Sequence, residues 1–124
     1  MQKFKKIISL YLPPILWCGF IFYLSCQPDL KVSEGIWDLI LRKIGHITEY
    51  FILTILVART ASGSIFRINK KSLIFGVIFS FLFAVSDEYH QTFIHGREGV
   101  PRDVGIDSLG MILAAFCLWR FKVK

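Results

Sequence analysis

Residues 7–26 read IISLYLPPILWCGFIFYLSC, a stretch of twenty residues without a charged side chain. A helix of about twenty apolar residues crosses the hydrocarbon core of a bilayer, so the stretch predicts a membrane-spanning helix. Three lysines precede it, but it is longer than the apolar part of a signal peptide and lacks a small-residue cleavage pattern, so we expect it to be retained. Pro13 and Pro14 predict a bend near its middle, because each lacks a backbone N–H and its ring clashes with the preceding turn.

The composition of the whole chain also favours a membrane protein. The 124 residues are 54% hydrophobic and include 12 Phe, and a soluble domain of this size would leave much of that surface in water. Many of the basic residues behind the net charge of +6 lie between apolar stretches, which is typical of membrane anchoring and argues against nucleic acid as a partner. The three cysteines predict neither a disulfide framework nor a metal site. We expect one domain over residues 1–124, with the lipid bilayer as its partner and no cofactor.

Three shorter apolar stretches follow the first one. Those between Lys43 and Arg59 and between Lys71 and Asp87 are about fifteen residues long, too short to cross a bilayer unless they take in polar residues at one end. Such residues must face other helices or a wet cavity, since lipid cannot solvate them. The predicted fold is therefore an all-α bundle of four transmembrane helices, with spans at about residues 7–26, 44–60, 72–92 and 103–120.

The segment between the first two spans has the pattern of an amphipathic helix. Four apolar residues and a lysine recur there at helical spacing, namely Val32, Ile36, Leu39, Ile40 and Lys43. With Ser33 as its N-cap and Trp37 as its anchor, the segment predicts a short interfacial helix that leads into span two.

The basic residues predict how the helices are oriented. The two tails and the second connection together hold ten Lys and Arg residues, whereas the first and third connections hold five. Cytoplasmic segments carry the excess of basic residues, so we expect a multi-pass protein with both termini in the cytoplasm.

With this orientation, the polar residues of three segments meet at the outer ends of the helices. The predicted polar pocket consists of Lys43, His46, Glu49, Tyr50, Asp87, Glu88, Gln91, Arg97, Arg102, Asp103 and Asp107. His46, Glu49 and Tyr50 share one helix face by their spacing. Either arginine of the set, paired with one of the carboxylates, would remove most of the cost of immersing these charges in the membrane.

Simpler explanations exist for individual members of the set. Asp103 and Asp107 suit the first turns of a helix, where acids complement the helix dipole. His46 is equally explained as an interfacial residue, and Gly110 with Ala114 predicts helix packing. A metal site from His46 and Glu49 with Asp87, Glu88 or His90 would have suitable ligands, but no dense metal motif and no nucleophile motif is present.

Several strings in the chain are similar to the VanZ-like family of membrane proteins. They are Phe22-Tyr23-Leu24-Ser25 with Gln27-Pro28, Arg42-Lys43 with His46 and Glu49-Tyr50, Asp87-Glu88-Tyr89-His90-Gln91-Thr92-Phe93, Gly96-Arg97, and Asp103 with Asp107 and Gly110. His95 departs from the proline that the family often has before Gly-Arg. The resemblance implies a four-helix bacterial membrane protein, and the family's named member is associated with reduced susceptibility to teicoplanin. The family's motif residues fall on Lys43, His46, Glu49, Tyr50, Asp87, Glu88, Gln91, Arg97, Asp103 and Asp107, which the charge pattern had also selected.

Three hypotheses about function follow. In the leading one, Arg97 and Arg102 hold an anionic group of an envelope component such as a lipid-linked headgroup, and this lowers susceptibility to glycopeptides and lipoglycopeptides. In the second, the protein is an intramembrane hydrolase or transferase in which His46 or Glu88 is the general acid or base. In the third, the charged residues only pair with one another in a structural or ion-handling bundle. We rank an enzyme below the first hypothesis because no nucleophile is evident.

Overall fold

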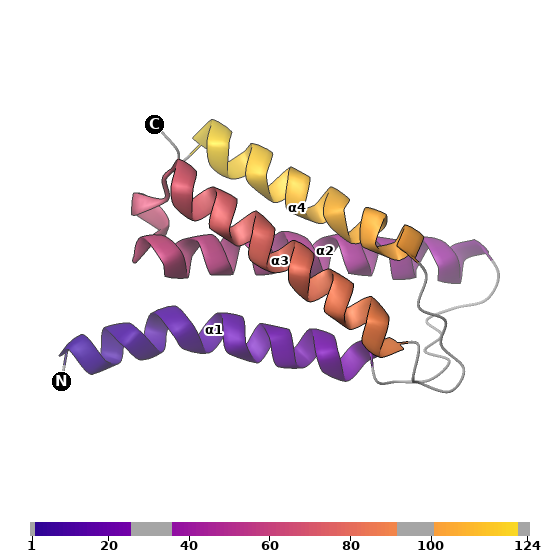
Figure 1. Cartoon of the computed structure of the whole chain (residues 1–124), viewed down its shortest axis with the longest axis horizontal. Coiled ribbons are helices and arrows are strands. Elements are labelled where there is room, and N and C mark those ends of the chain that lie inside the picture. The colour runs from indigo at the N-terminus through magenta and orange to yellow at the C-terminus, as the bar shows by residue number, and fades with distance from the viewer. Residues whose placement is uncertain (1, 26–35, 92–100, 122–124) are drawn as a thin grey trace.

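The computed structural model describes residues 2–25, 36–91 and 101–121, and within these ranges all regular secondary structure is helical. The helices are α1 (Gln2–Ser25), α2 (Ile36–Ser62), the short 3₁₀ helix η1 (Ile65–Arg67), α3 (Lys70–Gln91) and α4 (Pro101–Phe121). The four long helices confirm the predicted all-α fold, and they run roughly alongside one another in Figure 1.

Within the described part of the chain, three helices, α1, α3 and α4, are long and apolar enough to cross a membrane. Many of their large apolar side chains are exposed, among them Leu82 (61%), Ile112 (61%) and Phe116 (64%). A water-soluble protein rarely exposes so much contiguous apolar surface, whereas a bilayer solvates it. The chain is therefore a membrane protein.

Helix α2 is longer than the predicted second span. It begins at Ile36, whereas the span was expected to begin near residue 44, and it continues without a break for 27 residues. Residues 36–43 of the predicted interfacial helix therefore form the first turns of α2, and the structure shows no separate interfacial helix there. The remaining residues of that predicted helix, 32–35, lie outside the described residues.

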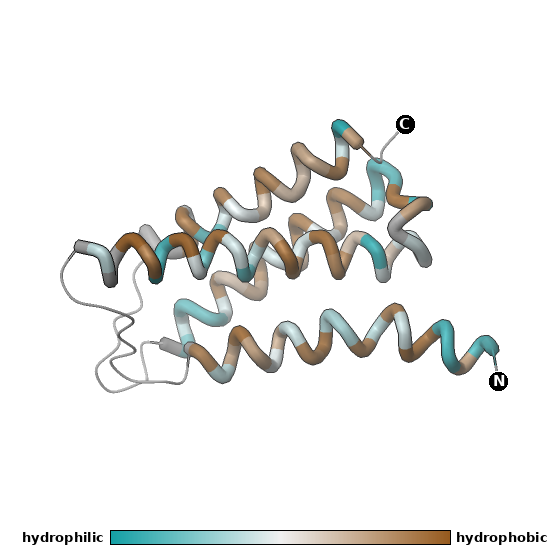
Figure 2. The backbone as a smooth tube through the Cα atoms, turned by 180° about the vertical axis from the view of Figure 1, so that it is seen from behind, coloured by the Kyte–Doolittle hydropathy of each residue, from teal (hydrophilic) through white to brown (hydrophobic). Residues whose placement is uncertain are grey.

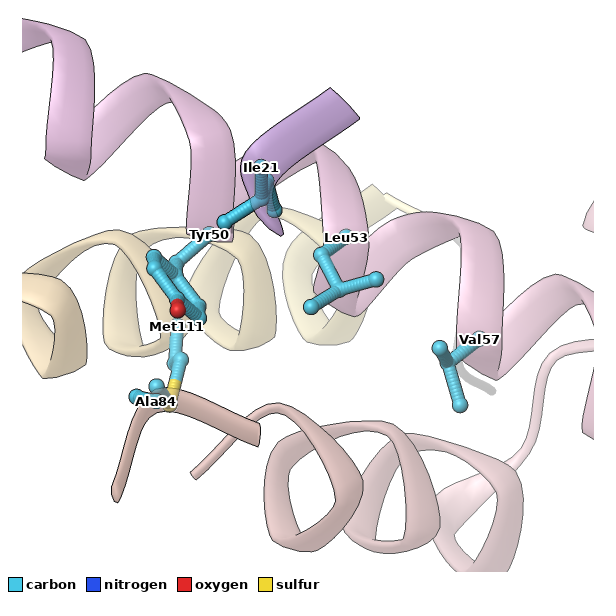
Figure 3. Close-up of a cluster of buried hydrophobic side chains, with 6 residues drawn as sticks. All are labelled: Ile21, Tyr50, Leu53, Val57, Ala84 and Met111. Atoms are coloured by element: carbon cyan, nitrogen blue, oxygen red, sulfur yellow. The ribbon is translucent and has the colours of Figure 1, made fainter. Parts of the chain in front are cut away.

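The core of the bundle lies around α2, which packs against each of the other long helices. Figure 3 shows one buried cluster, to which all four long helices contribute: Ile21, Tyr50, Leu53, Val57, Ala84 and Met111. A second cluster lies nearer the η1 end of the bundle and consists of Ala58, Ile68, Leu73 and Leu118. Together the two clusters run along α2 from Tyr50 to Ala58.

Two glycines bring the backbones of neighbouring helices close together. A Cβ at Gly110 of α4 would overlap the carbonyl oxygen of Ile47 in α2 and lie 3.0 Å from the backbone N of Phe51. A Cβ at Gly76 of α3 would lie 2.9 Å from the carbonyl oxygen of Thr54. Small residues permit such approaches in membranes, where dispersion and hydrogen bonds hold helices together. Ala114 is fully buried as well, so the prediction that Gly110 and Ala114 serve helix packing is confirmed.

Helix α1 contains Pro13 and Pro14 yet remains one helix, bowed along its length in Figure 1. These prolines lack the N–H groups that would bond the carbonyl oxygens of Ser9 and Leu10, four residues earlier. Helix α2 supplies the missing donors. Arg59 Nη1 donates to the Ser9 carbonyl (3.0 Å), and the Thr60 hydroxyl lies 2.6 Å from the carbonyl oxygen of Leu10.

A short turn reverses the chain between α2 and α3. Gly63 has a φ of 87°, a left-handed conformation that glycine adopts at little cost, and its N–H donates to the carbonyl of Arg59. Helix α3 then begins with a reciprocal cap. The Ser72 N–H donates to the Asn69 side chain, while the Asn69 N–H donates to the Ser72 hydroxyl. The turn therefore fixes where α3 starts relative to α2.

Candidate functional site

The candidate site lies at the end of the bundle opposite the two termini, where hydrophilic residues interrupt the apolar helices. Figure 2 shows them in the first half of α2 and at the end of α3. The structure brings together side chains from three helices at this end of the bundle.

His46 of α2 and Asp107 of α4 lie in direct contact in the site. The distance from His46 Nδ1 to Asp107 Oδ1 is 3.0 Å, and the Asp107 side chain is fully buried whereas the His46 side chain is 23% exposed. The close packing of the two helices explains the contact. Gly110 presses α4 against the backbone of Ile47, and Asp107 lies one turn before Gly110 on the same face. The close approach of the helices thereby delivers the carboxylate to the imidazole.

Tyr50 lies one turn after His46 and extends the same face of α2. Its hydroxyl donates to Asp87 Oδ2 of α3 at 3.4 Å, which is long for a bond between a hydroxyl and a carboxylate. Tyr50 is fully buried and Asp87 is 2% exposed. The carboxylates of four residues lie close enough to interact electrostatically with the Tyr50 hydroxyl, namely Asp87, Asp107, Glu49 and Glu88. The two pairs therefore belong to one polar cluster.

Three carboxylic acids of this cluster are almost entirely removed from solvent. Asp107 is 0%, Asp87 2% and Glu88 5% exposed. An ionised carboxylate loses its hydration when it is buried. This loss costs on the order of several kcal/mol unless partners compensate for it. Ionisable groups inside membrane proteins usually serve function for this reason. The buried acids make this end of the bundle the candidate site.

The other residues of the predicted pocket are partly exposed, or their side chains are outside the part of the chain that the structure describes. Lys43 and Glu49 are partly exposed on α2. Gln91, Arg102 and Asp103 belong to helices α3 and α4, but their side chains are not described, and Arg97 lies outside the described residues. The predicted pairing of Arg97 or Arg102 with the carboxylates therefore stays a prediction. Among the side chains that are described, no group of three or more His, Cys, Asp and Glu residues is arranged to hold a metal ion.

Sequence reasoning missed the residues that tie the site to its surroundings. Thr54 lies one turn after Tyr50, and its hydroxyl forms a 3.0 Å hydrogen bond with Ser80 of α3. The stripe of polar residues at positions 46, 50 and 54 is the signal that could have found it. Nothing in the sequence indicated that Trp17 Nε1 of α1 donates to the Glu49 carbonyl at 2.8 Å.

Helix α1 also reaches the end of α3. The ring of Phe22 lies 4.3 Å from that of His90, centroid to centroid, at an interplanar angle of 36°. Together with the bond from Trp17 to α2, this contact covers one side of the polar cluster with α1. The site is therefore shaped by all four long helices.

The family comparison covers nearly the whole chain. A family model described as VanZ/LLP1 matches residues 10–122. The comparisons with curated proteins and with solved structures found no match. The chain is therefore a membrane protein of the VanZ/LLP1 family.

Proposed function

We propose that this protein acts in a bacterial cell envelope, where the polar end of its bundle binds an anionic group of an envelope component. The consequence is lower susceptibility to glycopeptide and lipoglycopeptide antibiotics such as teicoplanin. One observation carries the proposal: Asp87, Glu88 and Asp107 are buried together at one end of a bundle whose described core is otherwise mostly apolar. A purely structural bundle gains little from three acids in such a place.

Carboxylates do not attract an anion themselves, so the proposal assigns the binding to arginine. Arg97 lies between α3 and α4, and Arg102 lies in the first turn of α4, one to two turns before Asp107. Guanidinium groups bind phosphate and carboxylate with paired hydrogen bonds. In this proposal the guanidinium groups are held in place by the carboxylates of Asp87, Glu88 and Asp107. The negative charge of these carboxylates offsets the positive charge of the arginines.

The orientation of the bundle belongs to the same proposal. The tails and the connection between α2 and α3 carry an excess of Lys and Arg, which supports a cytoplasmic location for the end of the bundle that contains η1. The polar cluster would then face the outer leaflet of the plasma membrane, where lipid-linked envelope precursors and glycopeptides meet.

A susceptibility assay tests this function. A strain that lacks the gene is complemented with the wild-type protein, Asp107→Asn, Arg97→Gln or Lys5→Ala, and the abundance of each variant is measured by immunoblot. We expect the wild-type protein and Lys5→Ala to raise the inhibitory concentration of teicoplanin at least fourfold, and the two site variants to fail at equal abundance. Equal susceptibility with and without the wild-type protein would refute the proposal.

One specific observation favours a second candidate function, an intramembrane hydrolase or transferase acting on a lipid-linked headgroup. His46 lies 3.0 Å from the buried carboxylate of Asp107, and a carboxylate in this position orients an imidazole for acid–base chemistry. Incubation of the purified protein with labelled lipid-linked substrates distinguishes the two functions. Conversion that His46→Ala and Glu88→Gln abolish supports the enzyme, and binding without conversion supports the first proposal.

A further inference from the structure

A second feature lies toward the other end of the bundle, in the half that contains η1. Helices α1, α2 and α3 line an open groove with a volume of about 490 Å³. Its lining is mostly apolar and consists of Tyr11, Pro14, Ile15, Cys18, Val57, Thr60, Ala61, Phe75 and Phe79. The groove shares no residue with the polar cluster, so its role does not depend on the function proposed above.

The shape of the groove limits what can occupy it. A helix is about 10 Å wide, so a volume of 490 Å³ would enclose roughly one turn of it. An acyl chain is much thinner, and a long part of one fits the same space. The volume also lies in the range of about 300–1,000 Å³ that is typical of small-molecule sites. The groove therefore suits a lipid chain better than a partner helix.

The charges near the groove indicate the class of lipid. Phe75 and Phe79 line the groove from α3, and Lys71 lies one turn before Phe75 on the same face, with its side chain exposed. Lys71 is thus placed at the end of the groove that points toward η1 and the chain termini. Anionic lipid headgroups attract lysines in this position.

The neighbouring lysine is directed elsewhere. Lys70 Nζ lies 5.5 Å from the ring centroid of Trp119, on α4. This cation–π contact directs Lys70 toward α4, a helix that contributes no residue to the groove lining. The two lysines have the same charge and nearly the same depth, but only Lys71 shares a face with the groove lining.

We propose that this groove binds an anionic phospholipid, with one acyl chain between α1, α2 and α3 and the phosphate paired with Lys71. The Thr60 hydroxyl of the lining does not oppose a chain there, because it is within hydrogen-bond distance of the carbonyl oxygens of Leu10 and Leu56. The ligand is held through its charge and its chain together, so a zwitterionic lipid with the same chains binds less well.

Native mass spectrometry of the purified full-length protein tests the proposal. The protein is exchanged into detergent micelles that contain equal amounts of phosphatidylglycerol and phosphatidylcholine with identical chains. We expect the wild-type protein to retain at least five times more phosphatidylglycerol than phosphatidylcholine. Lys71→Ala should reduce this preference to less than twofold, whereas Lys70→Ala, the matched control, should keep it.

A second pair of variants tests the groove itself. Ala61→Trp fills the groove and should reduce retention of both lipids at least fivefold, whereas Val85→Trp places the same side chain on an exposed part of α3 outside the lining and should leave retention unchanged. Ile15→Trp, at an exposed position of the lining, replaces Ala61→Trp if that variant does not fold.

Three results would overturn the proposal. The first is equal retention of the two lipids by the wild-type protein, and the second is an equal loss of preference in Lys70→Ala and Lys71→Ala. The third is a dimer of the wild-type protein that Ala61→Trp dissociates, because a second copy would then occupy the groove.

Discussion

The imidazole of His46 and the carboxylate of Asp107 meet at 3.0 Å across the interface of α2 and α4, with the carboxylate fully buried. The contact depends on the helix backbones, because Gly110 touches the carbonyl of Ile47, next to His46 in the chain. Backbone packing and site chemistry are therefore linked at this interface, and the predictions below separate them.

Gly110→Ala should destabilise the protein and disturb the site. Its Cβ would overlap the carbonyl oxygen of Ile47, so α4 must move away from α2. Overpacking of this kind costs about 1–3 kcal/mol. Thermal unfolding in detergent measures the loss. Gly105→Ala is the control in the same helix, because a Cβ there meets nothing within 4 Å, and it should leave the midpoint unchanged or raise it. Equal effects of the two substitutions would contradict the packing role of Gly110.

Asp107→Asn should keep the protein folded and abundant while it abolishes the effect on susceptibility. The amide has nearly the same shape as the carboxylate, so the packing of α4 survives, but the negative charge facing His46 is lost. Inhibitory concentrations and immunoblots on the same cultures measure both properties. If Asp107→Asn lowers only the abundance of the protein, the charged residues pair for structural reasons, and the third hypothesis from the sequence is correct.

Thr60→Val should cost between about 0.6 kcal/mol, the average measured for side-chain hydrogen bonds within membranes, and about 1.7 kcal/mol, the largest value in those measurements. The substitution removes the donor that lies 2.6 Å from the Leu10 carbonyl, which Pro14 leaves without its helical partner. In a Pro14→Ala background the backbone N–H at position 14 bonds that carbonyl, so Thr60→Val should cost less there. A double-mutant cycle of unfolding free energies measures the difference, and zero coupling would contradict this explanation.

Tyr50→Phe should reduce stability by less than about 1 kcal/mol, because the hydroxyl donates to Asp87 over a long distance of 3.4 Å. Thr54→Val, which removes the donor of the shorter 3.0 Å bond to Ser80, should cost more. Unfolding midpoints of the two variants in one detergent provide the comparison. A larger loss for Tyr50→Phe would show that the hydroxyl of Tyr50 is more important to the cluster than its distance suggests.

Much of the fold follows from the sequence, because apolar stretches bounded by charges specify membrane helices. The sequence also placed His46, Tyr50, Asp87 and Asp107 at one end, since helical spacing and span length fix depth and face. It did not predict their pairing. The rotation of one helix against another is set by contacts such as Gly110 on Ile47, which involve residues far apart in the chain.

Two further features were not predicted from the sequence, namely the start of α2 and the donors for the carbonyls that Pro13 and Pro14 leave without partners. Helix α2 begins at Ile36 because an amphipathic segment and a span with compatible periodicity can form one continuous helix, and no strong breaker separates them. The donors for the carbonyls freed by Pro13 and Pro14 come from Arg59 and Thr60, about fifty residues away. A local pattern reveals that a carbonyl lacks its partner, but not which distant residue will supply one.

The central claim is that buried acids at one end of the bundle position arginines that bind an anionic envelope group. The affinity of the purified protein for a polyprenyl phosphate in nanodiscs, compared between the wild-type protein, Asp107→Asn and Arg97→Gln, tests it most directly. We predict that both variants bind at least tenfold more weakly than the wild-type protein, while the control Lys5→Ala binds normally. Equal affinity of all four proteins would contradict the claim.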